Sequence, residues 1–161
     1  MSRIIRRRRI IGFGIERADI DGEAVCRMFN RAISDHPLPK HISTDNDPLF
    51  RFHRWLANLR VLEITEVRTV PHVPVSHPFA ERLIGTIRRE YLDRMFFWNA
   101  LDLERKLQEF CGYYNTSRVH QSLSGSTPTE QAGEPSQTCA ALDSFGWRKH
   151  CRGLFQTPIA V

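Results

Sequence analysis

The sequence predicts a domain of the α/β class. Three short runs rich in apolar or β-branched residues, at 10–15, 40–44 and 61–70, alternate with segments whose apolar residues recur every three or four positions. Such alternation of strand-like and helix-like runs is typical of α/β folds. The length of 161 residues, 41% of them hydrophobic and 10% aromatic, suits one globular domain with a buried core.

The first two elements are a strand and a helix. Residues 10–15 (IIGFGI) form a nearly continuous apolar run, which predicts a strand buried on both faces. Asp19 and Asp21 follow as candidate helix caps, and the apolar spacing over 22–34 predicts an amphipathic helix.

The next elements surround a cluster of acidic residues. Residues 40–44 predict a strand that ends at Asp45. Asp47, followed by Pro48, is a favourable start for a helix whose apolar residues continue as far as residue 59. The β-branched residues of 61–70 predict a further strand.

For the second half of the chain, the sequence predicts mainly helices. Apolar spacing predicts helices over 78–93 and 99–114, and the Gly, Ser, Thr and Pro content of 124–138 predicts a loop or linker. The last 23 residues have no clear period. Three strands make a thin sheet for this number of helices, which favours the interpretation that part of the sheet is missing.

Arginine dominates the positive charge of the chain. The formal net charge is +5, and Lys40, Lys106 and Lys149 are the only lysines among 23 basic residues. Arginine binds phosphate in a bidentate manner, so a polyanionic partner is favoured, although many basic proteins have none. No run approaches the roughly 18 apolar residues of a membrane helix, and the basic leader 1–9 precedes no signal-peptide core. We therefore expect a cytoplasmic protein without a membrane partner.

Two carboxylates are candidate catalytic and metal-binding residues. Asp45 closes a predicted strand, Glu81 opens a predicted helix, and 35 residues separate them. Carboxylates that meet at the carboxyl edge of an α/β sheet suit Mg²⁺, which accepts one or two carboxylates together with water and phosphate oxygens. The alternative is a turn residue and a first-turn helix residue that is stabilised by the helix dipole.

Three ordered motifs resemble those of a known family. Residues 43–50 (STDNDPLF) resemble the S/T-D-N-G-x-x-F segment around the second Asp of DDE-type transposases and retroviral integrases, with Asp47 where Gly is usual. Residues 76–82 (SHPFAER) resemble the segment around their Glu, at the D-x35-E spacing. Residues 114–128 match the Y-N-x-x-R-x-H-x-x-L-x-x-x-T-P pattern of insertion-sequence transposases, most closely the IS3/IS481 type.

The resemblance implies an RNase H-like integrase catalytic core with C-terminal helices. It divides the chain into a basic leader (1–9), a partial catalytic core (10–135) and a C-terminal tail (136–161). In the family, two strands and the first catalytic Asp precede the strand that resembles 10–15. Residues 1–9 are too short for two strands and contain no acid, so we expect a core truncated by two strands.

The function implied by the resemblance is DNA transposition, integration and recombination. In that reading Asp45 and Glu81 bind Mg²⁺ or Mn²⁺ for phosphodiester cleavage and strand transfer. Double-stranded DNA of transposon ends and target is the implied partner, with a homo-oligomer or full-length transposase, in the cytoplasm or at the nucleoid. Without the first Asp, we expect a catalytically inactive chain. The alternative is a non-catalytic DNA-binding or oligomerising fragment that modulates full-length transposase.

Four further residues are expected to face DNA. Gly85, Arg88 and Arg89 share the helix face of Glu81, where the arginines could contact phosphates and the glycine could allow close approach. Arg118 could also bind phosphate, with His120 orienting a supporting network. The alternatives are a solvated charged face for the helix and, after it, Asn115 as a cap of the helix end with local packing of His120.

Overall fold

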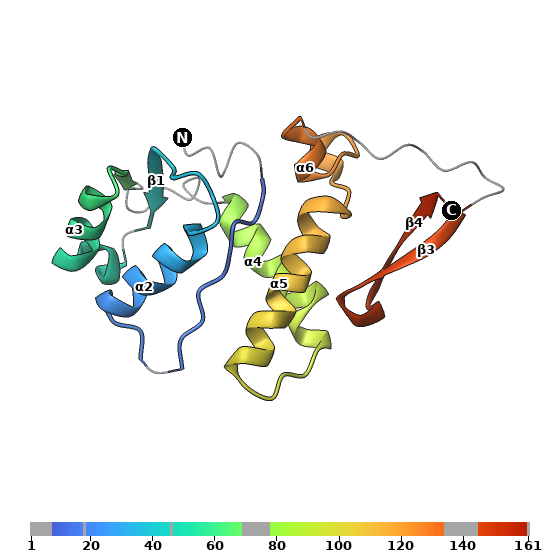
Figure 1. The fold of residues 1–161 in the computed structure, drawn as a ribbon, viewed down its shortest axis with the longest axis horizontal. Helices are drawn as coiled ribbons and strands as arrows, with labels where there is room; N and C mark the ends of the chain where they lie inside the picture. The colour runs from blue at the N-terminus through green and yellow to red at the C-terminus, as the bar shows by residue number, and fades with distance from the viewer. Residues whose placement is uncertain (1–7, 18, 46, 69–77, 134–144, 161) are drawn as a thin grey trace.

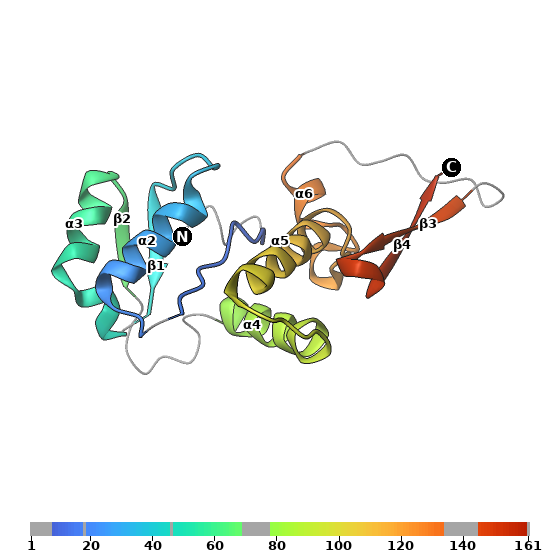
Figure 2. The ribbon, with the colours of Figure 1, turned by 60° about the horizontal axis from the view of Figure 1, so that its bottom comes forward.

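The computed structural model describes residues 8–17, 19–45, 47–68, 78–133 and 145–160. Two groups of elements lie on either side of the extended N-terminal segment, and a hairpin lies at the far end (Figures 1 and 2). In chain order, the helices and strands are α2 (Gly22–Ile33), β1 (His41–Thr44), α3 (His53–Val61), β2 (Thr65–Arg68), α4 (Pro78–Glu90), α5 (Ala100–Thr116), α6 (Pro128–Gln131), β3 (Phe145–His150) and β4 (Phe155–Ala160).

The first group consists of a small parallel sheet and two helices. β1 pairs with β2 from His41 opposite Thr65 to Thr44 opposite Arg68. Helices α2 and α3 pack against each other, and Trp55 of α3 is 1% exposed. We call the buried cluster beneath these elements the first core; its members are Val25, Ile33, Trp55, Leu59 and Ile64. Apolar burial of this kind is the main stabilising contribution to such a layer.

The two predicted capping residues, Asp21 and Asp47, each cap a helical turn in the structure. Asp21 caps α2, where its carboxylate accepts a hydrogen bond of 2.7 Å from the backbone N–H of Ala24. Asp47 caps a 3₁₀ turn over Pro48–Arg51, not the long helix predicted from here to residue 59. Phe52 has an extended backbone with ψ of 134°, which separates this turn from α3.

The strand predicted over 61–70 begins later than expected, and residues 69–70 lie outside the described residues. Val61 still belongs to α3, and Glu63 has a positive φ of 55° that ends the helical path. The backbone N–H of Ile64 then donates to the carbonyl of Leu59 over 2.9 Å, before β2 begins at Thr65. The β-branched composition indicated the strand correctly but not the helix end that occupies its first residues.

The second core lies between α4, α5 and the C-terminal hairpin. Its buried members are Ile10, Ile87, Tyr91, Leu107, Phe110, Cys111, Tyr114 and Cys151. Tyr91 and Phe110 are fully buried, with ring centroids 5.0 Å apart. The apolar face predicted for α5 is confirmed. On α4, Ile87 is buried, whereas Ile84 is 64% exposed.

Residues 10–15 are extended but belong to no strand, so the predicted buried strand is wrong. The described strands pair only as β1 with β2 and β3 with β4. The peptide groups of Ile10 instead bond to a side chain: Asn115 Oδ1 accepts from the Ile10 N–H over 2.9 Å, and Asn115 Nδ2 donates to the Ile10 carbonyl over 2.8 Å. Both residues are 6% exposed. The side-chain amide therefore supplies the two hydrogen bonds that a neighbouring strand would give.

The alternation of large and small residues explains how this segment fits between two layers. Phe13 and Ile15 pack against the second core. A Cβ at Gly12 would lie 3.1 Å from Cβ of Ala32, and one at Gly14 would lie 2.7 Å from Cβ of Met28. The glycines thus let α2 approach the backbone closely on one side, while apolar side chains fill the other.

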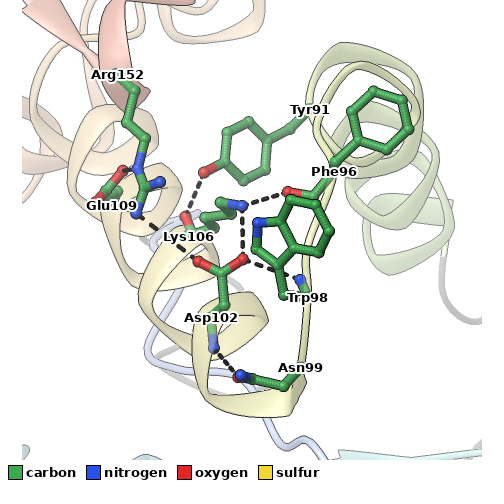
Figure 3. A network of polar contacts seen from close by, with 8 residues as sticks. All are labelled: Tyr91, Phe96, Trp98, Asn99, Asp102, Lys106, Glu109 and Arg152. Carbon is green, nitrogen blue, oxygen red and sulfur yellow. Dashed lines mark hydrogen bonds and ion pairs between the residues drawn. The ribbon is translucent and has the colours of Figure 1, made fainter.

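A polar network fixes the connection between α4 and α5 (Figure 3). Lys106 is 5% exposed, and its ammonium donates to the Phe96 carbonyl and, over 2.7 Å, to Asp102 Oδ2. Asp102 also accepts from the backbone N–H of Trp98 over 3.2 Å. Tyr91 of the α4 end donates to the Lys106 carbonyl over 2.8 Å. The Lys106–Asp102 bond lies within α5, and the other bonds join α5 to the α4 end or to the connection, so the network fixes the two helices relative to each other.

The C-terminal part contains more regular structure than expected. Within the predicted loop 124–138, Thr127 and Glu130 form a capping box at the start of α6. The tail without a clear period contains the antiparallel hairpin of β3 and β4. Phe155 stacks on Tyr113 of α5 at a centroid distance of 4.2 Å, which attaches the hairpin to the second core.

Replacement of Asn115 tests its role in holding the N-terminal segment. Asn115→Ala is expected to lower the free energy of unfolding by about 2–4 kcal/mol, because it leaves the buried N–H of Ile10 without its partner and the Ile10 carbonyl with only the weak thiol donor of Cys111. Asn58→Ala is the matched control, since Asn58 makes a similar paired amide contact with Asn30, but at an exposed position. Urea unfolding of both variants measures the difference, and equal losses would contradict the assignment.

Candidate functional site

Asp45 lies directly after the last residue of β1 and is exposed. Its Oδ1 accepts a hydrogen bond of 3.1 Å from the backbone N–H of Asp47. Asp47 in turn accepts from the N–H of Leu49 over 2.9 Å. Two successive side-chain turns therefore shape the backbone around Asp45. Asp47, at the position where the family usually has Gly, acts here as a cap.

Glu81 lies in the first turn of α4 and is also exposed. The partial positive charge of a helix N-terminus favours a carboxylate at this position. Asp45 and Glu81 thus belong to different layers of the molecule. Asp45 extends from the sheet of the first core, and Glu81 from a helix of the second.

The carboxyl ends of β1 and β2 lie at one edge of the sheet because the two strands are parallel. This is the edge at which open α/β sheets usually bind ligands. A further carboxylate that the sequence did not single out, Glu66, lies in β2 near this edge, and its side chain is 10% exposed. It accepts hydrogen bonds from Thr44 Oγ1 (2.8 Å), Trp55 Nε1 (3.1 Å) and Arg68 Nε (2.9 Å).

The hydrogen bonds to Glu66 determine its ionisation. Burial by itself would raise the pKa of Glu66, but the bonds from Thr44, Arg68 and Trp55 and the charge of Arg68 outweigh burial and lower it. Glu66 is therefore an anion at neutral pH. Because its donors lie as far as 22 residues away in sequence, no local pattern could have identified it.

The three residues of α4 expected to face DNA lie on its solvent side or near it. Arg88 and Arg89 are exposed, whereas Gly85 is half-buried. The guanidinium of Arg89 folds back over Gly85, so that a Cβ added at Gly85 would lie 3.0 Å from Arg89 Nη1. The absence of a side chain at residue 85 thus makes room for an arginine of the same helix.

Arg118 is held by a partner that sequence reasoning missed. Its guanidinium donates to both oxygens of Glu90, over 2.7 and 3.1 Å, and its Nη1 lies 3.1 Å from Nδ1 of His120. It also lies over the ring of Tyr114, 5.7 Å from the centroid. These contacts engage the Arg118 side chain within the protein and join the end of α4 to the segment after α5.

His120 is 8% exposed and packs edge-on against Tyr114 at a centroid distance of 4.7 Å. Burial lowers the pKa of His120, and the positive charge of Arg118 lowers it further. The ring is therefore neutral at pH 7. Among the described residues, its Nε2 has no hydrogen-bond partner. Asn115, a candidate helix cap in the sequence, instead binds Ile10 as described above.

The described residues contain neither a cluster of metal-binding side chains nor a membrane-spanning helix. No group of three or more His, Cys, Asp or Glu side chains in them could hold a metal ion. No helix in that part of the chain is long and apolar enough to cross a membrane.

The family model and the relatives that match this sequence agree with each other. Residues 62–128 match the Integrase core domain family. The putative transposase InsD for insertion element IS2E of Escherichia coli (strain K12) is 28% identical over 120 residues, which cover 74% of this chain and 54% of that protein. The transposase InsD for insertion element IS2A/D/F/H/I/K of Escherichia coli has the same identity over 39% of its length. The chain thus spans about half the length, or less, of these relatives.

Two solved structures share the fold. A chain of the simian T-cell lymphotropic virus intasome, in complex with PP2A regulatory subunit B56 gamma, matches 80% of this chain and 48% of its own length, with a TM-score of 0.59 and 17% identity. The catalytic core domain of BIV integrase matches 70% of this chain and 71% of its own, with a TM-score of 0.54 and 22% identity.

The structural matches define the class of the domain as the RNase H-like fold of integrase catalytic cores, here with a small sheet. Within that class, the sequence is similar to the Integrase core domain family over residues 62–128 and to insertion-element transposases at 28% identity. The expected fold class is therefore confirmed, and the sequence matches support the expected DDE-type transposase/integrase family.

The ionised state of Glu66 predicts how stability depends on pH. Its pKa is lowered in the folded protein, so its stabilising contribution is present above the ordinary Glu pKa of about 4.3 and is lost as the pH falls through the folded value. Glu66→Gln removes this titration. Between about pH 6 and pH 3, the free energy of unfolding measured with urea is expected to fall less steeply in the variant than in the wild type. Parallel pH profiles would contradict this.

Proposed function

We propose that this domain acts on DNA in transposition or integration, with Asp45 and Glu81 as its metal-binding carboxylates. The observation that carries the proposal is the position of Asp45 at the carboxyl edge of a parallel sheet, with 35 residues between it and a Glu in the first turn of α4. The integrase core match and the relatives among insertion-element transposases support the same function.

The chemistry of the two side chains fits a hard divalent cation. Both are exposed carboxylates, and carboxylate oxygens are preferred ligands of Mg²⁺ and Mn²⁺. When bound, such a cation neutralises charge on a phosphodiester during in-line displacement. The role of the protein residues is to hold ligand oxygens: Asp45 from a backbone shaped by the Asp47 turn, and Glu81 from a helix start.

The proposed DNA contacts lie on α4 and after α5. Gly85, Arg88 and Arg89 follow Glu81 on the same helix, where the exposed guanidiniums would bind phosphates without reading sequence. Arg118 belongs to the proposed set, but a phosphate would have to compete there with the carboxylate of Glu90. Double-stranded DNA of element ends and target is the proposed partner, together with further copies of the core or a full-length transposase.

The first test measures the binding of Mn²⁺ to the 161-residue chain by electron paramagnetic resonance. The wild type is expected to bind one Mn²⁺, and Asp45→Asn and Glu81→Gln are each expected to weaken binding at least tenfold, because each removes an anionic ligand oxygen. Asp93→Asn, an exposed acid in the 3₁₀ turn after α4, is the control. Binding that is insensitive to both site variants would refute the assignment.

The same chain is expected to give no strand-transfer or nicking product above a Glu81→Gln control. Two carboxylates are fewer ligands than a two-metal reaction needs. Metal-dependent turnover would contradict this part of the proposal. Salt-sensitive DNA binding by a chain that binds no Mn²⁺ through Asp45 and Glu81 would favour the second candidate, a DNA-binding or oligomerising role that modulates full-length transposase.

A second test measures DNA affinity as a function of salt. Arg88→Gln and Arg89→Gln are each expected to reduce the slope of log K against log salt by about 1, because each loses one phosphate contact. Arg118→Gln should do the same and also lower the unfolding midpoint, since Glu90 loses its partner. Arg60→Gln, at an exposed position in the last turn of α3, is the control. Unchanged slopes for all α4 variants would exclude this surface.

A further inference from the structure

Glu66 is a carboxylate with three side-chain donors and no part in the function proposed above. Its Oε1 accepts from Thr44 of β1 and Trp55 of α3, and its Oε2 accepts from Arg68 of β2. The side chain of Glu66 is only 10% exposed. Three elements of the first core are thus joined at one carboxylate, next to the edge from which Asp45 extends.

The strand register shows how this carboxylate acts on its neighbour. Thr44 lies opposite Arg68, and Glu66 lies two residues before Arg68, so all three share one face of the sheet. Thr44 is 5% exposed on that face. The next residue, Asp45, is exposed. The bond to Glu66 therefore anchors the last strand residue from which the backbone of Asp45 continues.

We propose that Glu66 is a positioning residue for Asp45, acting through the hydroxyl of Thr44. This inference rests on the proposed metal-binding role of Asp45. Glu66 is not itself proposed as a ligand, because both its oxygens are engaged and Arg68 balances its charge. Its distinct contribution is to fix the direction in which the carboxylate of Asp45 leaves the strand.

The donor set explains why an anion occupies this position. A carboxylate offers only acceptors, whereas a glutamine amide has two N–H donors at one end. With Gln at residue 66, either the amide N–H groups face the Thr44 hydroxyl and the Trp55 N–H, or they face Arg68. The first orientation sets amide N–H groups against the Trp55 N–H, and the second keeps the Thr44 and Trp55 bonds but sets the amide N–H groups against Arg68. Glu66→Gln therefore loses at least one of the three bonds, together with the negative charge, with little change of side-chain volume.

The test measures Mn²⁺ affinity of the 161-residue chain by electron paramagnetic resonance, with Mn²⁺ alone as the probe. Glu66→Gln is expected to weaken binding about tenfold, as removal of groups that orient metal ligands commonly does. Thr44→Val removes the linking hydroxyl with similar shape and should weaken binding in the same direction. Thr44→Ser keeps the hydroxyl and should retain wild-type affinity.

Trp55→Phe is the matched structural control. It removes a second donor to the same oxygen of Glu66 and opens a space in the first core, but it does not touch the β1 backbone. It should lower the unfolding midpoint and change Mn²⁺ affinity by less than twofold. If Trp55→Phe weakens binding as much as Thr44→Val, the effect is one of stability and the proposal fails.

A metal-free measurement separates this inference from the function on which it rests. The backbone order parameter of Asp45, measured by ¹⁵N relaxation, should fall in Glu66→Gln and Thr44→Val from near the rigid value of about 0.85, and stay unchanged in Thr44→Ser. Unchanged order in the first two variants overturns the positioning role. If the order parameter of Asp45 falls in Glu66→Gln and Thr44→Val but the wild-type chain binds no Mn²⁺, the positioning role is supported and the metal site is rejected.

Discussion

The paired hydrogen bonds between the Asn115 amide and the peptide groups of Ile10 attach the N-terminal segment, which lies between the two groups of elements, to α5. They join residues 105 positions apart and replace the strand ladder that the apolar run 10–15 would otherwise require. Because buried peptide groups are costly when unpaired, this side chain stabilises the position of the segment inside the protein. Phe13 and Ile15 of the segment pack against the second core, and its glycines lie against α2.

The segment also sets the spacing between the two proposed ligands. Asp45 extends from the layer of α2 and β1, and Glu81 from the layer of α4 and α5. Gly12 and Gly14 allow the first layer to approach the segment closely, while Phe13 fills the second core. A larger side chain at either glycine would push the layers apart. The relative position of the carboxylates is therefore a property of interlayer packing and not of the 35-residue spacing alone.

Local signals in the sequence predicted elements well, and contacts between distant residues were missed. The Asp21 cap and the parallel pairing after residue 40 depend on nearby residues or on simple apolar patterns. Whether 10–15 joins a ladder depends on which strands lie beside it, which composition does not encode. The hairpin of β3 and β4 was missed because its alternation is weak, and the partner of Arg118, Glu90, lies 28 residues earlier.

The pattern over residues 114–128, which resembles that of insertion-sequence transposases, mainly makes structural contacts within this protein. Asn115 binds Ile10, Arg118 pairs with Glu90 at the end of α4, and His120 packs on Tyr114. These buried contacts join α4, α5 and the N-terminal segment, and so orient the helix that carries Glu81. Chemistry at an exposed carboxylate tolerates little displacement of its support, since a ligand must lie near 2 Å from a small cation. A recognisable sequence pattern can therefore mark the frame that holds a reactive group, and not the group itself.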